Sequence, residues 1–346
     1  MIWLSWRQFR AQTLTALGLL AVLVIGLVVL GLQMRHSWNV DVVGCEALDN
    51  CQRVQAHFQD QYEVPVNLLS LLLLVVPAIL GAFWGAPLIA RELETGTHRL
   101  AWTQSITRTR WLATKLGVVL LAGVVVAAAF ALLLTWASDP FDDLSGTRFG
   151  ALNFGSRNVV PIGYAVFALV LGVTIGLLVK RTLAAMAITI AAFIVVQVTM
   201  PFFVRPHLMP PVEESVAVNR ESLARADGFG LVGEPPLSPD APIPAGTTMQ
   251  VDGYEIPGAW VLPAVLTVLD GSGDPADPNM LDECFRAQGG PAGAGECLAT
   301  KNLHFNVSYH PGSRYWPFQG IELAIFTVLA AVLAGFCFRR IPRVVG

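Results

Sequence analysis

Long uncharged stretches dominate the pattern of hydrophobic and polar positions along the chain. Five windows free of Asp, Glu, Lys and Arg reach the roughly 20 residues that a helix needs to cross about 30 Å of hydrocarbon. A sixth apolar stretch is shorter, but Trp316 and Phe318 just before it suit the headgroup region. The pattern therefore predicts an all-α polytopic membrane protein with six transmembrane helices, at approximately 11–34, 64–90, 116–138, 158–179, 182–204 and within 319–346.

The segment 205–318 differs from the rest of the chain, because it holds 15 of the 22 prolines. An apolar run within it, Ile256–Leu269, is interrupted by Pro257 and Pro263 and is too short, at about 14 residues, to span a bilayer comfortably. The prolines and the weak periodicity predict an extracytoplasmic domain of short helices and irregular loops. We expect the run PAVLTVLD to contribute to its small apolar core.

Charged residues predict the orientation in the membrane. With the N-terminus placed in the cytoplasm, the inner segments hold twelve basic residues and two acidic ones, Glu92 and Glu94, while the outer segments hold ten basic and twenty-three acidic residues. Short cytoplasmic loops are enriched in Lys and Arg. Both termini are therefore predicted to be cytoplasmic.

The first ten residues mix Trp3 and Trp6 with Arg7 and Arg10, which suits a short helix lying in the inner interface. The uncharged stretch that follows is about 24 residues long, against about 7–15 for a signal-peptide core, and no A-x-A cleavage pattern follows it. We therefore expect residues 1–10 to form an interfacial helix and the first transmembrane helix to stay uncleaved.

Four of the five cysteines fall in the predicted outer segments. Cys45 and Cys51 lie in the first outer loop, Cys284 and Cys297 lie in the 205–318 domain, and Cys337 falls within the last helix. An even number of cysteines on the oxidising side of the membrane indicates two disulfides. Proximity in sequence favours Cys45–Cys51 and Cys284–Cys297; cross-pairing between the loops and free thiols are the alternatives.

Composition and motifs exclude several classes of protein. With 54% hydrophobic residues, 14% charged residues and a mean hydropathy of +0.58, the chain is neither disordered nor an ordinary soluble enzyme. None of the three lysines follows a glycine, so there is no P-loop. The spacing of His304 and His310 matches no standard metal site, and we interpret both as surface residues. Glu322 is expected near the outer interface, where its carboxylate would be hydrated.

One inner segment has the composition of a protein contact: the loop 91–115, RELETGTHRLAWTQSITRTRWLATK. Arg91–Glu94 is predicted to continue the preceding helix and Gly96 to end it. A short helix is expected at 98–105, and Thr107 is expected to cap the next helix. The resulting elbow carries charge at its rim and aromatic surface at its tip, which suits a partner protein. A basic loop lying on anionic lipid is the alternative.

This loop resembles the cytoplasmic coupling segment of ABC-2 type permeases, the membrane subunits of ATP-driven exporters. The opening WLSWRQFR and the ending RYWPFQGIELAIF…GFCFRR also look like actinobacterial members of that family. The residues that match the family's coupling pattern are Glu92 or Glu94, Gly96, Thr97, Leu100, Thr107, Arg108, Arg110 and Lys115.

The resemblance implies a multi-pass protein of the bacterial plasma membrane that exports a substrate. The sequence does not identify this substrate, but a cavity at the interface of two permeases, lined by Leu, Val, Phe and Ala, would accept many amphiphiles. It also implies two partners besides the lipid bilayer: a cytosolic ATP-binding cassette subunit, which carries ATP and Mg, and a second permease copy, identical or different. We expect no catalytic residue, metal or cofactor in this chain, and no nucleic-acid partner. We expect the ATPase-coupling loop to use Glu92, Glu94, Gly96, Thr97, Arg99, Trp102 and Arg108, with Glu92, Glu94, Thr97 and Arg99 in contact with the ATPase.

Two other functions are weighed against export. One is a non-transporting membrane receptor or immunity protein that binds through the outer domain. The other is a membrane enzyme whose site lies in that domain, near His304 and His310.

Overall fold

The computed structural model describes residues 2–47, 51–96, 107–146, 148–233, 244, 246–262, 265–287 and 291–343. The chain divides into two compact units. The first, called the helical unit here, comprises Met1–Leu208 and Trp316–Gly346. The second, called the sheet unit, comprises Met209–Tyr315.

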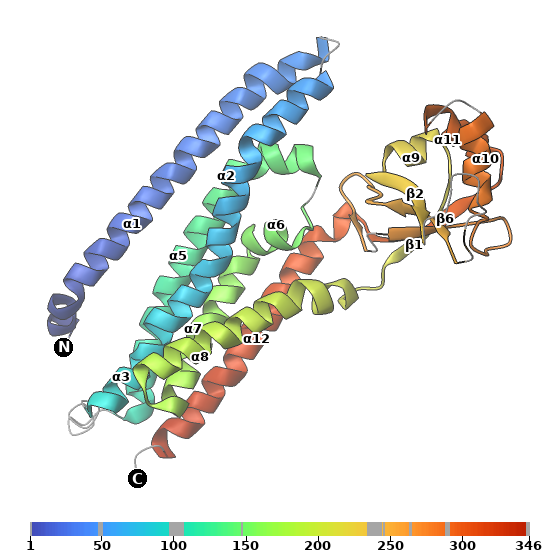
Figure 1. Cartoon of the computed structure of the whole chain (residues 1–346). Helices are drawn as coiled ribbons and strands as arrows, with labels where there is room; N and C mark the ends of the chain where they lie inside the picture. The colour runs from blue at the N-terminus through green and yellow to red at the C-terminus, as the bar shows by residue number, and fades with distance from the viewer. Residues whose placement is uncertain are drawn as a thin grey trace. The chain divides into compact units, whose positions relative to one another are not determined.

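Six segments among the described residues are long and apolar enough to cross a membrane, which confirms the predicted number (Figure 1). Short π-helical and 3-10 turns extend several of them, and one short helix precedes the fourth. The elements of the helical unit are α1 (Ile2–Ser37), η1 (Trp38–Val42), η2 (Val43–Ala47), α2 (Cys51–Leu80), η3 (Gly81–Gly85), α3 (Ala86–Thr95), α5 (Arg108–Ser145), α6 (Ala151–Ser156), α7 (Val160–Val179), α8 (Thr182–Thr199), η4 (Met200–Val204), η5 (Arg205–His207), α12 (Tyr315–Arg340) and η7 (Ile341–Arg343).

Residues 1–10 were predicted to form a short interfacial helix. In the structure residues 2–10 are helical and belong to the first turns of α1 (Ile2–Ser37), and their position at the membrane interface stays a prediction. No proline or glycine occurs between Trp3 and Ala16, so nothing in the sequence interrupts the backbone hydrogen bonds there.

Helix α7 forms the centre of the helical unit. In its most apolar stretch 72% of the residues are buried, against 22% in the segment that contains α8. Two glycines of η3 allow α7 to approach closely, because a Cβ atom at Gly81 or Gly85 would lie 2.5 Å from the carbonyl oxygen of Ala168 or Leu169. These glycines therefore allow tight helix packing.

The sheet unit contains six described strands, all paired antiparallel, in the order β1-β6-β5-β3-β2, with β4 beside β6. Three described helices accompany them. The elements are β1 (Val212–Ala217), α9 (Arg220–Ala224), β2 (Gly228–Val232), β3 (Thr248–Asp252), β4 (Trp260–Val261), β5 (Val265–Leu269), α10 (Asn279–Ala287), α11 (Pro291–Ala299), β6 (His304–His310) and η6 (Gly312–Arg314).

This sheet shows that the prediction of an all-α protein with an irregular outer segment was wrong. None of the described strands contains a proline. Strand β6 alternates as a half-buried strand should, with Phe305 and Val307 buried and Asn306 exposed. The predicted apolar run does contribute to the core, through Leu266 and Val268.

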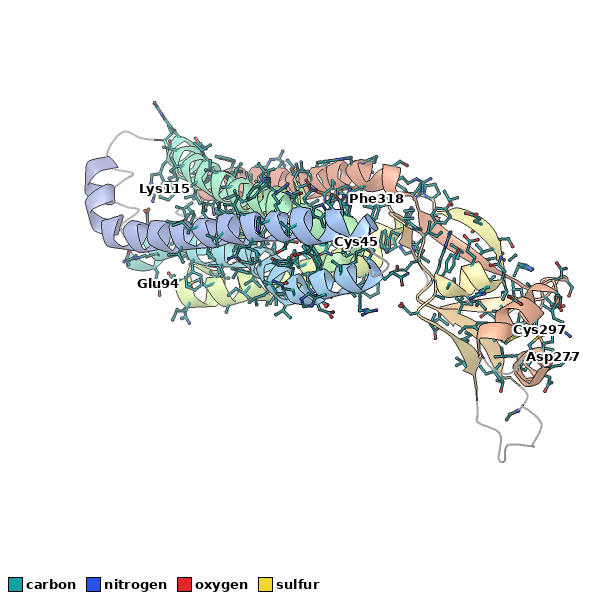
Figure 2. The ribbon with its side chains drawn as sticks, turned by 90° about the horizontal axis from the view of Figure 1, so that it is seen from above. Cys45, Glu94, Lys115, Asp277, Cys297 and Phe318 are labelled. Carbon is teal, nitrogen blue, oxygen red and sulfur yellow. A yellow bond between two sulfur atoms is a disulfide. The ribbon has the colours of Figure 1, made fainter. Side chains whose placement is uncertain are left out.

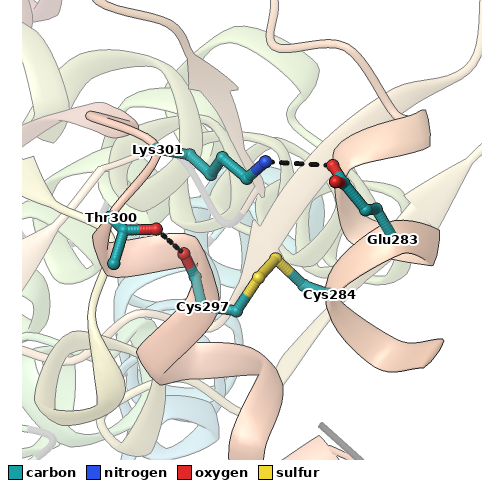
Figure 3. The surroundings of a disulfide bond; sticks show 5 residues. All are labelled: Glu283, Cys284, Cys297, Thr300 and Lys301. Carbon is teal, nitrogen blue, oxygen red and sulfur yellow. Dashed lines mark hydrogen bonds and ion pairs between the residues drawn. A yellow bond between two sulfur atoms is a disulfide. The ribbon is translucent and has the colours of Figure 1, made fainter. Parts of the chain in front are cut away.

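Both disulfides pair as proximity in sequence favoured. Cys45 and Cys51 join η2 to the start of α2 with their Cα atoms 5.0 Å apart. Cys284 and Cys297 join α10 to α11 at 5.5 Å, beside the ion pair of Lys301 and Glu283 (Figure 3).

Candidate functional site

The elbow between α3 and α5 begins and ends as predicted. Helix α3 stops at Thr95, and Gly96 adopts the left-handed conformation, with φ of 74°. Thr107 is extended, and its hydroxyl accepts a hydrogen bond from the Arg110 backbone N–H, which caps α5. The elbow tip, residues 97–106, lies outside the described residues. It contains Thr97, Arg99, Trp102 and the predicted short helix.

Glu92 ties α3 to α5. Its carboxylate forms an ion pair with the Lys115 ammonium, and both side chains are about three-tenths exposed. The ammonium also lies 4.6 Å from the centre of the Trp111 ring, which favours a cation. Figure 2 shows Lys115 and Glu94 at one end of the helical unit and Cys45 at the other. We call these the elbow end and the disulfide end.

Glu94 contacts a different helix. Its Oε2 accepts a hydrogen bond from the Thr182 backbone N–H at 2.9 Å and another from the Thr182 hydroxyl at 2.7 Å. Thr182 is the first residue of α8, and Arg181 before it makes no side-chain capping bond. The carboxylate therefore satisfies donors at the start of α8, where the helix dipole favours negative charge.

Arg108 ties the C-terminal segment to the start of α5. Its guanidinium donates a hydrogen bond to the Pro342 carbonyl at 2.8 Å. Next to it, Ile341 is buried in an apolar cluster with Ile89 of α3 and Leu112 of α5. The start of α1, the end of α3 and the end of α12 all lie at this end of the unit (Figure 1).

These contacts make the elbow a junction between several parts of the chain. Its two flanks contact α5, α8 and the C-terminal segment. Sequence reasoning placed Glu92 and Glu94 against a partner protein and did not foresee that both have partners within this chain. Two signals were present for Glu94: an acidic residue on a basic surface, and an α8 start that lacks a capping side chain at Arg181.

The disulfide end contains buried charge pairs. Arg205 and Glu322 are 1% and 0% exposed, and their nearest atoms are 2.9 Å apart. The Tyr164 hydroxyl donates to the same carboxylate. Arg157 and Asp142 form a second buried pair, at 2.8 Å.

The first of these pairs corrects the expectation that the Glu322 carboxylate is hydrated. A buried carboxylate requires a counter-charge. Here that counter-charge is 117 residues away in sequence, so no local pattern could reveal it.

The prediction that both histidines of the sheet unit lie on the surface was wrong for one of them. His310 is fully buried, not on the surface: its ring packs against Trp260, with centroids 5.5 Å apart, and its Nδ1 lies 3.2 Å from an Arg314 nitrogen. His304 is partly exposed at the other end of β6. Among the described residues no group of three or more His, Cys, Asp or Glu side chains is placed to hold a metal ion.

Comparison with known protein families identifies a related family. The model of a family described as ABC-2 membrane transporter related matches residues 17–205, more than half of the chain. The match includes the elbow and ends before the sheet unit. No curated protein and no solved structure matches the chain.

Proposed function

Because the chain belongs to the ABC-2 membrane transporter related family, we propose that it is the permease subunit of an ATP-driven exporter. The permease forms the membrane pathway, and a separate cytosolic ATP-binding cassette subunit, which carries ATP and Mg, energises it. A second permease copy, identical or different, completes the pathway in the bacterial plasma membrane. The cargo is an unidentified amphiphile, because a cavity at the interface of two such permeases would be lined largely by Leu, Val, Phe and Ala.

The observation that carries this proposal is the junction at the elbow. Glu92, Glu94 and Arg108 connect its flanks to α5, α8 and the C-terminal segment. A partner that pushes on the elbow tip would therefore move several helices together. A ligand shifts such an equilibrium only by binding one arrangement more tightly than the other. ATP binding by the partner subunit supplies that difference.

In this proposal the elbow end is cytoplasmic and the sheet unit is extracytoplasmic. The charge distribution supports this orientation, because the segments assigned to the inside carry twelve basic residues against two acidic ones. The disulfides Cys45–Cys51 and Cys284–Cys297 support it independently, since both fall in segments assigned to the oxidising side.

Affinity purification from the native membrane in mild detergent tests the proposal. We expect a stoichiometric P-loop subunit and ATPase activity to accompany the chain. Arg99→Ala and Trp102→Ala, at the elbow tip, should lower both. Arg53→Ala is the matched control, because Arg53 is an exposed cation at the start of α2, at the disulfide end, and should change neither. Recovery of the chain alone, under conditions that preserve transporter complexes, would contradict the proposal and favour a receptor.

Inside-out membrane vesicles test the direction of transport. With a panel of fluorescent amphiphilic dyes as probes, we expect ATP-dependent accumulation inside these vesicles and its loss with Arg99→Ala. Accumulation that appears only in right-side-out vesicles loaded with ATP would contradict export.

A further inference from the structure

The start of α8 depends on another part of the chain. Only Lys180 and Arg181 connect α7 to α8, and Lys180 adopts the left-handed conformation that makes so short a turn possible. Arg181, at the N-cap position, makes no side-chain capping bond. The first N–H groups of a helix have no partner within that helix, and they carry its positive dipole end.

Glu94 supplies what this turn lacks. Its carboxylate receives the Thr182 N–H and hydroxyl together, from a residue 88 positions away. Glu92 and Glu94 are two residues apart on one helix, so their side chains leave it about 200° apart. One carboxylate therefore binds α5 and the other binds α8.

Small side chains take part in the apolar contact between α3 and α8, together with Met186. Ala86 and Ala90 of α3 cluster with Ala185 of α8. Small residues allow close approach but offer few directional contacts. Helix α8 lies at the periphery of the unit, in a segment that is 22% buried. The two hydrogen bonds to Glu94 add a directional contact between the start of this helix and the elbow.

We propose that Glu94 is a positioning residue that transmits elbow movement to α8 by capping that helix from α3. This inference rests on the proposed function, because it assumes that an ATPase subunit moves the elbow. It differs from the sequence-based hypothesis in assigning Glu94 to a contact within the permease. When the elbow moves, the α7–α8 turn follows it, and the peripheral α8 changes its angle against the central α7.

Three substitutions in the purified complex test this role. Glu94→Ala removes the cap, Glu94→Gln keeps one acceptor oxygen without the charge, and Thr182→Val removes the hydroxyl but keeps the N–H. We expect the ATPase subunit to stay bound and to hydrolyse ATP in all three. Dye moved per ATP hydrolysed should fall about tenfold in Glu94→Ala and about two- to threefold in the other two, because bonds to a charged group are the stronger ones.

A capping residue at the start of α8 itself distinguishes a role of Glu94 in transmitting elbow movement from a role in stabilising the helix alone. Arg181→Ser places a good N-cap residue at the start of α8. In a Glu94→Ala background it should restore helix stability and membrane abundance but not the coupling of transport to hydrolysis. Restored coupling would overturn the proposal, because Glu94 would then be only a cap.

Two further outcomes are distinguishable from this one. If Glu94→Ala releases the ATPase subunit and Thr182→Val does not, Glu94 contacts that subunit directly and the inference is wrong. If no ATPase subunit accompanies the unsubstituted chain, the proposed function fails first, and this inference fails with it.

Discussion

Removing one partner of the buried Arg205–Glu322 pair should destabilise the helical unit strongly. The guanidinium donates two hydrogen bonds to the carboxylate, at 2.9 and 3.1 Å, and both side chains are enclosed. Glu322→Gln leaves the arginine without a counter-charge. Breaking a buried pair in this way costs about 3–5 kcal/mol, because the remaining charge is desolvated and uncompensated.

The same reasoning predicts a milder result when both charges are removed. Arg205→Met with Glu322→Leu replaces the pair by apolar side chains of similar volume, an exchange that is often neutral or stabilising. The Tyr164 hydroxyl would lose its acceptor, at a cost of about 1–3 kcal/mol. The double variant should therefore be more stable than Glu322→Gln.

The assay is the apparent midpoint of thermal unfolding in detergent. For a unit of this size 1 kcal/mol corresponds to about 2–4 °C, so Glu322→Gln should lower the midpoint by about 6–20 °C. Asp143→Ala is the control at the same end of the unit. This substitution breaks an ion pair with Arg148. The Asp143 and Arg148 side chains are 51% and 49% exposed, and exposed ion pairs contribute about 0–1 kcal/mol to stability. Equal midpoints for Glu322→Gln and Asp143→Ala would refute the reasoning, as would a double variant less stable than the single one.

Three further results are expected. Gly172→Ala should destabilise the helical unit by about 1–3 kcal/mol in the same thermal assay, because its new methyl group would collide with a backbone carbonyl of η3, whereas Gly18→Ala, with nothing within 4 Å, should not. A membrane-impermeant maleimide should label Ser215→Cys on intact cells and Arg110→Cys only after permeabilisation; the reverse would invert the proposed topology. The Ser272 hydroxyl donates a hydrogen bond to the Asp270 carboxylate and lowers its pKa. This interaction stabilises the fold above the ordinary pKa of Asp, and the stabilisation is lost as the pH falls through the lowered pKa. In acid unfolding, Asp270→Asn should therefore lose less stability over that pH range than the unsubstituted chain.

The features that sequence predicted well are those with local causes. A transmembrane helix needs only an uninterrupted apolar stretch, and six such stretches are present. The ends of the elbow were identifiable because Gly96 tolerates a positive φ and the Thr107 hydroxyl can reach the backbone three residues on. The disulfides join cysteines only 6 and 13 residues apart.

The features that sequence missed depend on residues far apart in the chain. Strand β1 pairs with β6 in a register that places Val212 opposite Tyr309, and no local pattern indicates such a pairing. High proline content suggested irregular structure because it was averaged over the whole segment, whereas none of the described strands contains a proline. Arg205, the partner of Glu322, is also distant in sequence, so no local pattern indicated it.

The elbow depends both on local sequence features and on contacts with residues far away in the chain. The charge pattern identified Glu92 and Glu94 as the two acidic residues on a surface predicted to be basic, and the structure gives each a partner within the chain: Lys115 for one and the start of α8 for the other. These two contacts reach different helices, α5 and α8, as the proposed transmission of elbow movement requires.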